Sequence, residues 1–461
     1  MIRERLEKLR NWMREHGGKV EAFVVPSNDP HFSEYVAAHW GCRAWISGFD
    51  GSAGTVVVTA DGRAALWTDS RYFLQAEAQL AGTGVELQRM GLAGTPTIAE
   101  WLAAAEVRRV GGDGRLVSRA AFEELKGDLA AVGIEWVAMG DPFETIWDGR
   151  PALPNAPAFL LQETYSGEGV ADKLARIRAE GGTERAVRLV AVLDEIAWAL
   201  NVRGGDIAYN PLVISYLSIE PERAVLFVDP GKFEAADRER LRCEAGVEMR
   251  PYGDFADYLR GELSGKTVIV NPNGLDVYHW EVLSTAGAHI LEEATPYGVI
   301  AGMKAVKNPR EIDGFRRAME VDGVVLVRFE RWLEGTIAAG ERPTELEVAA
   351  RLHEFRQAAA ETEGFQGESF ETIAGYGEHG AIVHYEATPE SDVPIGTESF
   401  LLIDSGGQYL YGTTDITRTY HFGTPTAEQR RDYTAVLRGM IDLCGARFPA
   451  GTRGAQLDVL A

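Results

Sequence analysis

Two aspartates, Asp404 and Asp415, are spaced so that they could hold a pair of cations. They lie in FLLIDSGGQYLYGTTDITRTYHF, residues 400–422, where two runs rich in β-forming residues are separated by glycines. This pattern predicts two antiparallel strands, with Leu401 and Ile403 on the face opposite Asp404. If the chain reverses near residues 408–410, the two aspartates are cross-strand partners with Cβ atoms roughly 4.5–5.5 Å apart.

Two carboxylates this close repel each other unless positive charge lies between them. A pair of metal ions about 3.5–4 Å apart meets that requirement, and such pairs activate water for hydrolysis. Thr417 falls on the same strand face as Asp415, so its hydroxyl could hold a carboxylate oxygen in place. The spacing alone leaves a second interpretation open, in which both aspartates only end strands or cap turns.

His384 is the other candidate for chemistry. It stands in GAIVHY, an extended pattern in which Ile382 and His384 would share one strand face. A lone histidine in a strand is more often structural than catalytic, so its residue type alone assigns no role.

The acidic composition argues against nucleic acid and anionic membranes as main partners. Lys and Arg total 46 against 69 for Asp and Glu, a formal charge of −23 over 461 residues. Such a surface repels phosphate groups. No run reaches the ~18 apolar residues of a membrane span, and the charged amphipathic start is unlike a secretion signal. Cys42, Cys243 and Cys444 are widely separated, as in reduced cytoplasmic proteins, so we expect a cytoplasmic location.

Alternating strand and helix patterns predict an α/β (α+β) protein of three segments. Two α/β domains are expected over residues 1–153 and 154–303, and a third domain over 304–461. Clustered prolines mark the first boundary. Within the first domain the pattern predicts a helix over residues 31–39 and a hairpin over 54–68.

The second segment resembles the first. VRLVAVLDEIAWALNVRGGD echoes AFVVPSNDPHFSEYVAAHW, with a strand, an acidic residue and then an aromatic-containing helix in each. Either a duplication or two generic α/β units would explain this likeness.

The third segment opens with Asn308, Pro309 and Glu311, which predict the start of a long helix. Its apolar residues are expected to face inward, namely Ile312, Phe315, Met319, Phe329 and Trp332. A capping box is also predicted at Thr344. The sequence ends at Ala461 about two turns into a predicted helix with no stop signal, so we expect the third domain to be incomplete here.

GAIVHYEATPESD and LLIDSGGQYLYGTTDITRTYHFGTPT closely resemble the catalytic domain of Xaa-Pro aminopeptidases, the aminopeptidase P group of the pita-bread metallopeptidases. The resemblance continues in WTDSRYFLQA, LDEIAWALNVRGGDIAYNP and KAVKNPREIDGFRRA, and so covers nearly the whole chain. It implies the long form of the enzyme, with two related α/β domains ahead of a pita-bread domain.

The resemblance also implies roles for matching residues. Asp404 resembles the ligand of one metal ion, Asp415 the ligand that bridges both, and His384 the histidine beside the scissile carbonyl. Arg71, in DSRYF, resembles a substrate-contacting arginine. The alternative for Arg71 is a surface ion pair with Asp69.

By resemblance, the substrates are peptides with proline in second position, the cofactor is two manganese ions, with cobalt or zinc as alternatives, and the assembly is a homodimer. The family completes its metal site with a histidine of an HGxGHG stretch and two later glutamates, none of which occurs in these 461 residues. We therefore expect this length of chain to hold metal weakly and to turn over little. No role passes to His379 or His421.

Two rival functions share the fold. One is a metal-free hydrolase like creatinase, and the other is a peptidase-like binding module of the kind found in histone chaperones. Both lack the metal-binding aspartates, so the presence of Asp404 and Asp415 favours the peptidase.

Overall fold

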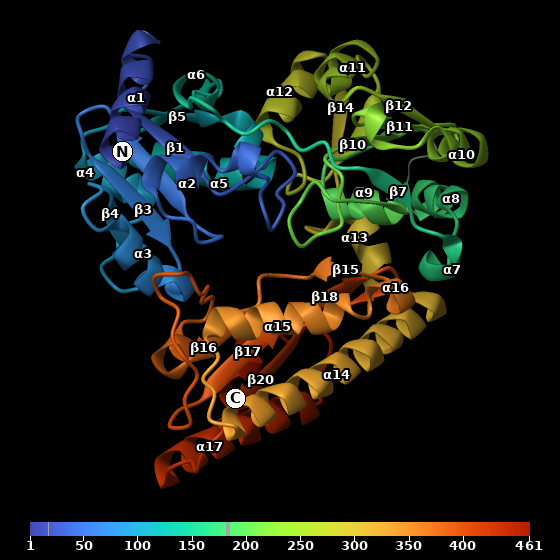
Figure 1. Ribbon diagram of the computed structural model, residues 1–461. Helices are drawn as coiled ribbons and strands as arrows, with labels where there is room; N and C mark the ends of the chain where they lie inside the picture. The colour runs from blue at the N-terminus through green and yellow to red at the C-terminus, as the bar shows by residue number, and fades with distance from the viewer. Residues whose placement is uncertain (17, 181–184) are drawn as a thin grey trace. The chain divides into compact units, whose positions relative to one another are not determined.

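The computed structural model describes residues 1–16, 18–180 and 185–461 (Figure 1). The chain forms two compact units. The first contains Met1–Asp322, Ala359–Phe370 and Gly406–Thr414, and the second contains Gly323–Ala358, Glu371–Ser405 and Asp415–Ala461. Each unit is described by itself below.

The first unit begins with a six-stranded sheet whose strand order is β4-β3-β2-β1-β5-β6. Strands β1, β2 and β3 pair antiparallel, and the outer strands add in parallel. The predicted hairpin over residues 54–68 is β2 with β3, and is confirmed. The strands are β1 (Ala22–Pro26), β2 (Thr55–Thr59), β3 (Ala64–Thr68), β4 (Glu86–Arg89), β5 (Arg109–Asp113) and β6 (Glu135–Met139).

Helices cover both faces of this sheet because its strands are apolar on both sides. Phe23 and Val25 of β1 pack in one core with Leu9, whereas Val24 packs in the opposite core with Leu102. Alternate residues of one strand therefore support two layers of helix. The helices are α1 (Ile2–Glu15), α2 (Cys42–Ser47), α3 (Phe73–Leu80), α4 (Ile98–Ala104), α5 (Arg119–Ala131) and α6 (Phe143–Ile146).

The helix predicted over residues 31–39 is wrong, because only a 3-10 turn at Ala38–Trp40 forms there. Asp29 Oδ1 accepts hydrogen bonds from the backbone N–H groups of His31 (2.9 Å) and Ser33 (3.1 Å). Phe32 between them has a φ of 56°. A side chain that binds nearby backbone in this way competes with helix formation.

A second six-stranded sheet follows, with the order β12-β11-β10-β8-β13-β14. Its strands are β8 (Val187–Val190), β10 (Tyr216–Ile219), β11 (Ala224–Phe227), β12 (Val247–Arg250), β13 (Thr267–Val270) and β14 (His289–Glu292). The helices around it are α8 (Val170–Glu180), α9 (Leu193–Ala199), α10 (Ala235–Ala245), α11 (Phe255–Gly261), α12 (Val277–Thr285) and α13 (Gly298–Ala305); β7 (Ala158–Leu160), β9 (Val202–Gly204) and α7 (Glu163–Ser166) lie beside it.

The two sheets match strand for strand. Strand β8 pairs antiparallel with β10 and parallel with β13, as β1 pairs with β2 and β5. The outer pairs also agree in direction. Shared order and direction in all six strands indicate one α/β domain used twice, and this confirms the prediction of two related amino-terminal domains.

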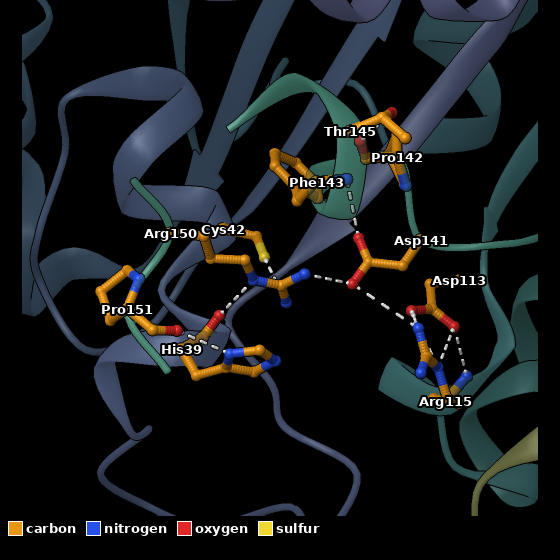
Figure 2. Close-up of polar contacts among 10 residues, drawn as sticks. All are labelled: His39, Cys42, Asp113, Arg115, Asp141, Pro142, Phe143, Thr145, Arg150 and Pro151. Atoms are coloured by element: carbon orange, nitrogen blue, oxygen red, sulfur yellow. Dashed lines mark hydrogen bonds and ion pairs between the residues drawn. The ribbon is translucent and has the colours of Figure 1, made fainter. Parts of the chain in front are cut away.

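The proline-rich connection between the two sheets is fixed at both ends by buried charges. Figure 2 shows Arg150, which donates to Asp141 Oδ2 (2.6 Å) and to the carbonyl of His39 (2.9 Å). Nδ1 of His39 in turn donates to the Pro151 carbonyl (2.8 Å). At the other end, Asp206 Oδ1 accepts from the Ala156 N–H (3.2 Å).

The third segment starts with the predicted long helix, α14 (Pro309–Ala338). Its capping box is confirmed, since Asn308 and Glu311 each accept the other's backbone N–H. The inward face is partly wrong, because Ile312, Phe315 and Met319 are 39–47% exposed while Phe329 is fully buried. The residues buried in their place are Ala318, Val321 and Val325, which lead to Phe329 at spacings of three and four residues.

The second unit holds a three-stranded antiparallel sheet in the order β16-β17-β20. Its elements are β16 (Ile373–Tyr376), β17 (Leu401–Ser405), β20 (Ile416–Tyr420), α15 (Glu345–Gln357), α17 (Ala427–Gly445) and α18 (Gly454–Leu457). One face of the sheet packs on α15 and on the later part of α14 through a core that includes Phe329, Leu352, Leu401 and Ile403.

The segments of this region that belong to the first unit form another small sheet, ordered β15-β18-β19, beside α16. They are β15 (Phe365–Glu368), β18 (Gly407–Tyr409), β19 (Gly412–Thr413) and α16 (Ala360–Glu363). No helix among the described residues is both long and apolar enough to cross a membrane.

Candidate metal and catalytic site

The two aspartates come from the paired strands β17 and β20, but they are not direct partners. Asp404 lies opposite Thr417, and Asp415 immediately precedes β20. The reversal pairs Gln408 with Thr413, so it is centred one residue later than predicted. The prediction of direct pairing is therefore wrong by two residues in register, which leaves Asp415 diagonal to Asp404 on the same face.

Thr417 fixes the first of these carboxylates, as predicted. Its hydroxyl donates to Oδ1 of Asp404 over 2.8 Å. Asp415 lies two residues before Thr417, and the two-residue period of a strand directs both side chains to one face. The three side chains thus converge on the open face of the sheet.

The electrostatics of the pair agree with this placement. Partial desolvation raises the pKa of Asp415, and the carboxylate of Asp404 raises it further. Within residues 1–16, 18–180 and 185–461, neither carboxylate forms an ion pair with an Arg, Lys or His. Two like charges facing each other without a protein cation form a donor set suited to metal ions.

The opposite face of β17 explains why Asp404 points outward. Leu401 and Ile403 are buried in the core of the second unit. Ser405 is also buried, and its hydroxyl accepts a hydrogen bond from Nη2 of Arg356 (3.0 Å). With alternate residues held in this way, the remaining positions of the strand must face solvent.

His384 is exposed and lies in a turn, so the predicted strand over GAIVHY is wrong. A 3-10 helix at Gly377–Ala381 replaces it, and the Tyr385 N–H then closes a turn onto the Ile382 carbonyl (3.1 Å). Short-range alternation of apolar and polar residues did not distinguish this compact loop from a strand.

This loop begins on the same sheet face as Asp404. A Cβ built on Gly380 would lie 3.7 Å from Cβ of Leu402, which shares that face of β17. A Cβ on Gly375 would lie 2.9 Å from backbone atoms of His379 and Gly380. Only glycine therefore lets the loop fold this closely over β16.

Sequence reasoning missed Glu345, a fully buried carboxyl group beneath the same loop. It accepts hydrogen bonds from the Tyr376 N–H (2.6 Å) and the Tyr385 hydroxyl (2.7 Å), and Nδ1 of His379 lies 3.0 Å away. The predicted capping box of Thr344 with Glu347 is present. The position of Glu345 in the first turn of a predicted helix explains why it was missed, because an acidic residue there is ordinarily taken to be solvated and to interact with the helix dipole.

Arg71 lies in the first unit, at a 3-10 turn spanning Ser70–Tyr72. Its Nε and Nη2 each donate to Asp69 over 2.8 Å, so the ion pair weighed as an alternative role is present. The guanidinium is 40% exposed and lies over the ring of Tyr72. The hydrogen bonds to Asp69 raise the pKa of Arg71.

Asp404 and Asp415 alone would supply only part of a dinuclear metal site. Two carboxylates with one supporting hydroxyl suit hard divalent cations. Among the described residues, no group of three or more His, Cys, Asp or Glu side chains is arranged to hold a metal ion. Asp404 and Asp415 therefore offer two carboxylate groups to a divalent cation on this face.

Family models match the chain in three consecutive parts. The Creatinase/Prolidase N-terminal domain matches residues 5–146, and a second model of the same description matches residues 149–311. Metallopeptidase family M24 matches residues 313–461. Aminopeptidase P2 of Arabidopsis thaliana is 38% identical, with the alignment covering 100% of this chain and 68% of that protein. This chain belongs to the Xaa-Pro aminopeptidase family.

Other members of the Xaa-Pro aminopeptidase family agree with that assignment. A probable Xaa-Pro aminopeptidase P of Neurospora crassa is 40% identical over 99% of this chain and 68% of its own length. Among solved structures, the X-prolyl aminopeptidase of Caenorhabditis elegans superposes with a TM-score of 0.92 at 31% identity, covering 100% of this chain and 76% of that one. That protein is described as a cytosolic enzyme with a di-nuclear active site.

Proposed function

We propose that this protein is a metal-dependent aminopeptidase that removes the first residue of peptides whose second residue is proline. Family membership supports the reaction class. The single observation that carries the proposal is the placement of Asp404 and Asp415 on one open sheet face, where no cationic side chain of the part of the chain that the structure describes pairs with them.

The bond before proline needs a dedicated enzyme. It is a tertiary amide without an N–H, so peptidases that hydrogen-bond the scissile N–H lose that contact. A site that binds the free amino terminus and the proline ring can still accept such a peptide. Arg71 is proposed to make one of these substrate contacts.

Asp404 and Asp415 would hold two divalent ions, and manganese is proposed as the native metal. Ions bound there would lower the pKa of a shared water and polarise the carbonyl. His384 would donate a hydrogen bond to the carbonyl oxygen as it gains negative charge. Removing one such donor typically costs roughly 2.7–4 kcal/mol.

Three further assignments belong to the proposal. The domain limits are residues 1–153, 154–303 and 304–461. The enzyme is proposed to be a homodimer and to act in the cytoplasm on peptides with proline in second position.

The decisive experiment is hydrolysis of an Xaa-Pro peptide by the full-length protein with added manganese. Asp415→Asn keeps the side-chain size but removes the charge, so bound metal and kcat should both fall. Thr417→Val is the milder control, because it removes only the hydroxyl that holds Asp404. A protein that binds no stoichiometric metal and cleaves no Xaa-Pro peptide would be a binding module instead.

His384→Ala tests the second role. We expect kcat to fall by about 10²–10³ with metal content unchanged, because one oxyanion donor is lost. Measurement of kcat and of bound manganese on the same preparation separates this from loss of metal. An unchanged kcat would remove His384 from the mechanism.

A further inference from the structure

Glu345 is a fully buried acidic side chain at the first position of α15. A buried carboxyl group is costly unless its oxygens are hydrogen-bonded. Glu345 meets this need with three donors, and all of them come from residues 376–385.

These donors sit at the start, the middle and the end of that segment. The Tyr376 N–H lies at the end of β16, His379 lies in the following 3-10 helix, and Tyr385 follows the turn. The carboxyl group of Glu345 therefore anchors the loop at Tyr376 and Tyr385, which are its two ends, and at His379 between them. His384 is the residue directly before the last of these anchors.

Tyr385 is the strongest link between Glu345 and His384. Its ring is buried and stacks on the ring of His379 with centroids 4.5 Å apart. Its hydroxyl contacts Glu345 at 2.7 Å and Ser391 at 3.0 Å. Burial raises the pKa of Tyr385 to about 12, so the phenol keeps the proton that it donates to Glu345.

His384 itself is exposed and lies in a turn. A residue in a turn takes its direction from the backbone on each side. The hydrogen bond from the Tyr385 N–H to the Ile382 carbonyl closes the turn that contains His384. The hydroxyl of Tyr385 then anchors this turn to Glu345 of α15. Displacement of a catalytic group by about 1 Å can cost 10²-fold in rate.

We propose that Glu345 is a positioning residue for His384, acting through Tyr385 and His379 to hold the loop of residues 376–385. This inference rests on the proposed peptidase function. It adds a buried carboxyl group that touches neither metal nor substrate but sets the direction of the histidine that does contact substrate.

The kinetic test compares Glu345→Gln with Glu347→Gln. Glutamine at 345 cannot accept from all three donors, so kcat for an Xaa-Pro peptide should fall about tenfold to a hundredfold, with KM and bound metal unchanged. Glu347→Gln alters an exposed residue of the same helical turn and should leave kcat within about twofold. Equal kcat values for the two variants would overturn the proposal.

Tyr385→Phe provides a second variant in case Glu345→Gln fails to fold. It keeps the buried ring and removes only the hydroxyl that reaches Glu345, so it should fold and lower kcat by about tenfold without changing KM. Full kcat in a folded Tyr385→Phe protein would show that the anchor does not act on His384.

A spectroscopic measurement keeps this test separate from activity. In protein labelled with ¹³C at histidine Cε1, the His384 resonance is assigned by its absence in His384→Ala. The proposal expects one sharp resonance in the parent protein and a shifted or split one in Glu345→Gln and Tyr385→Phe, while Glu347→Gln resembles the parent. If the parent protein cleaves no Xaa-Pro peptide, the proposed function fails. If the His384 resonance is the same in Glu345→Gln and Tyr385→Phe as in the parent protein, the role of Glu345 is refuted.

Discussion

The two amino-terminal domains share a strand order but use the same turn for different purposes. Asp69 follows β3 and Asp229 follows the matching strand β11, and each accepts the backbone N–H two residues later (3.1 and 2.8 Å). A cation follows in both turns. Arg71 stays 40% exposed, whereas the side chain of Lys232 is only 4% exposed.

Lys232 serves the fold of the second domain. Its Nζ contacts Oδ2 of Asp206 at 2.5 Å, and that carboxylate also accepts the backbone N–H groups of Ala156 and Ile214. The first domain places its buried charges elsewhere, in the Arg150 network of Figure 2. In the turn after β3 the guanidinium of Arg71 is therefore not needed for a buried ion pair, and this exposed group is accessible to a ligand.

The largest loss of stability is expected when the buried ion pair between Lys232 and Asp206 in the second domain is broken. Asp206→Ala leaves a buried ammonium and two backbone N–H groups without their acceptor, so it should destabilise the protein by about 3–5 kcal/mol. The matched change Asp69→Ala removes an exposed ion pair and a turn cap and should cost about 1 kcal/mol. Thermal unfolding of both variants measures the difference, and equal losses would contradict the contrast between the domains.

The two amino-terminal domains should also differ in how pH affects their stability. Burial raises the pKa of Glu195 to about 7 from 4.5, the neighbouring Asp194 adds to the shift, and Lys304 and Arg188 oppose it. Between these pH values the folded protein binds a proton that the unfolded chain has released, so stability falls as pH rises. The loss should approach about 3 kcal/mol above pH 7. When the two similar stretches of sequence are aligned, Pro30 of the first domain falls at the position of Glu195. The first domain therefore has no titratable side chain there.

Thermal unfolding between pH 4.5 and 8 tests this expectation, with Glu195→Gln as the control. The glutamine variant should lose less stability than the parent protein as pH rises. A parent protein whose unfolding temperature falls no more than that of the variant would show that Glu195 ionises normally in the fold.

The smallest effect is expected for the two cations of the matching turns, Arg71 and Lys232. Arg71→Ala should raise KM for an Xaa-Pro peptide about tenfold, the loss of one charge-assisted hydrogen bond, with little change in unfolding temperature. Lys232→Met should do the reverse, lowering stability while leaving KM alone. Should KM stay constant in Arg71→Ala, the ion pair with Asp69 would be the whole role of that arginine.

The errors of sequence reasoning are concentrated where distant segments meet. Capping boxes at Asn308 and Thr344 and the hairpin over residues 54–68 were predictable because their partners lie a few residues apart. The loop around His384 was not, because its conformation depends on Glu345, which lies 34–40 residues earlier in the chain. The helix wrongly predicted over residues 31–39 is an exception with a local cause, because Asp29 accepts backbone N–H groups only two and four residues further along the chain.

The amino-acid sequence by itself determined which residues of β17 face the core and which face outward. Alternation placed Leu401 and Ile403 inward and Asp404 outward, since a two-residue period needs no distant information. Only the tertiary structure decided that Asp415 is diagonal to Asp404, because one residue in the reversal changes every pairing beyond it. Burial of Glu345 and Lys232 was decided in the same way, by donors and acceptors that become neighbours only when the chain has folded.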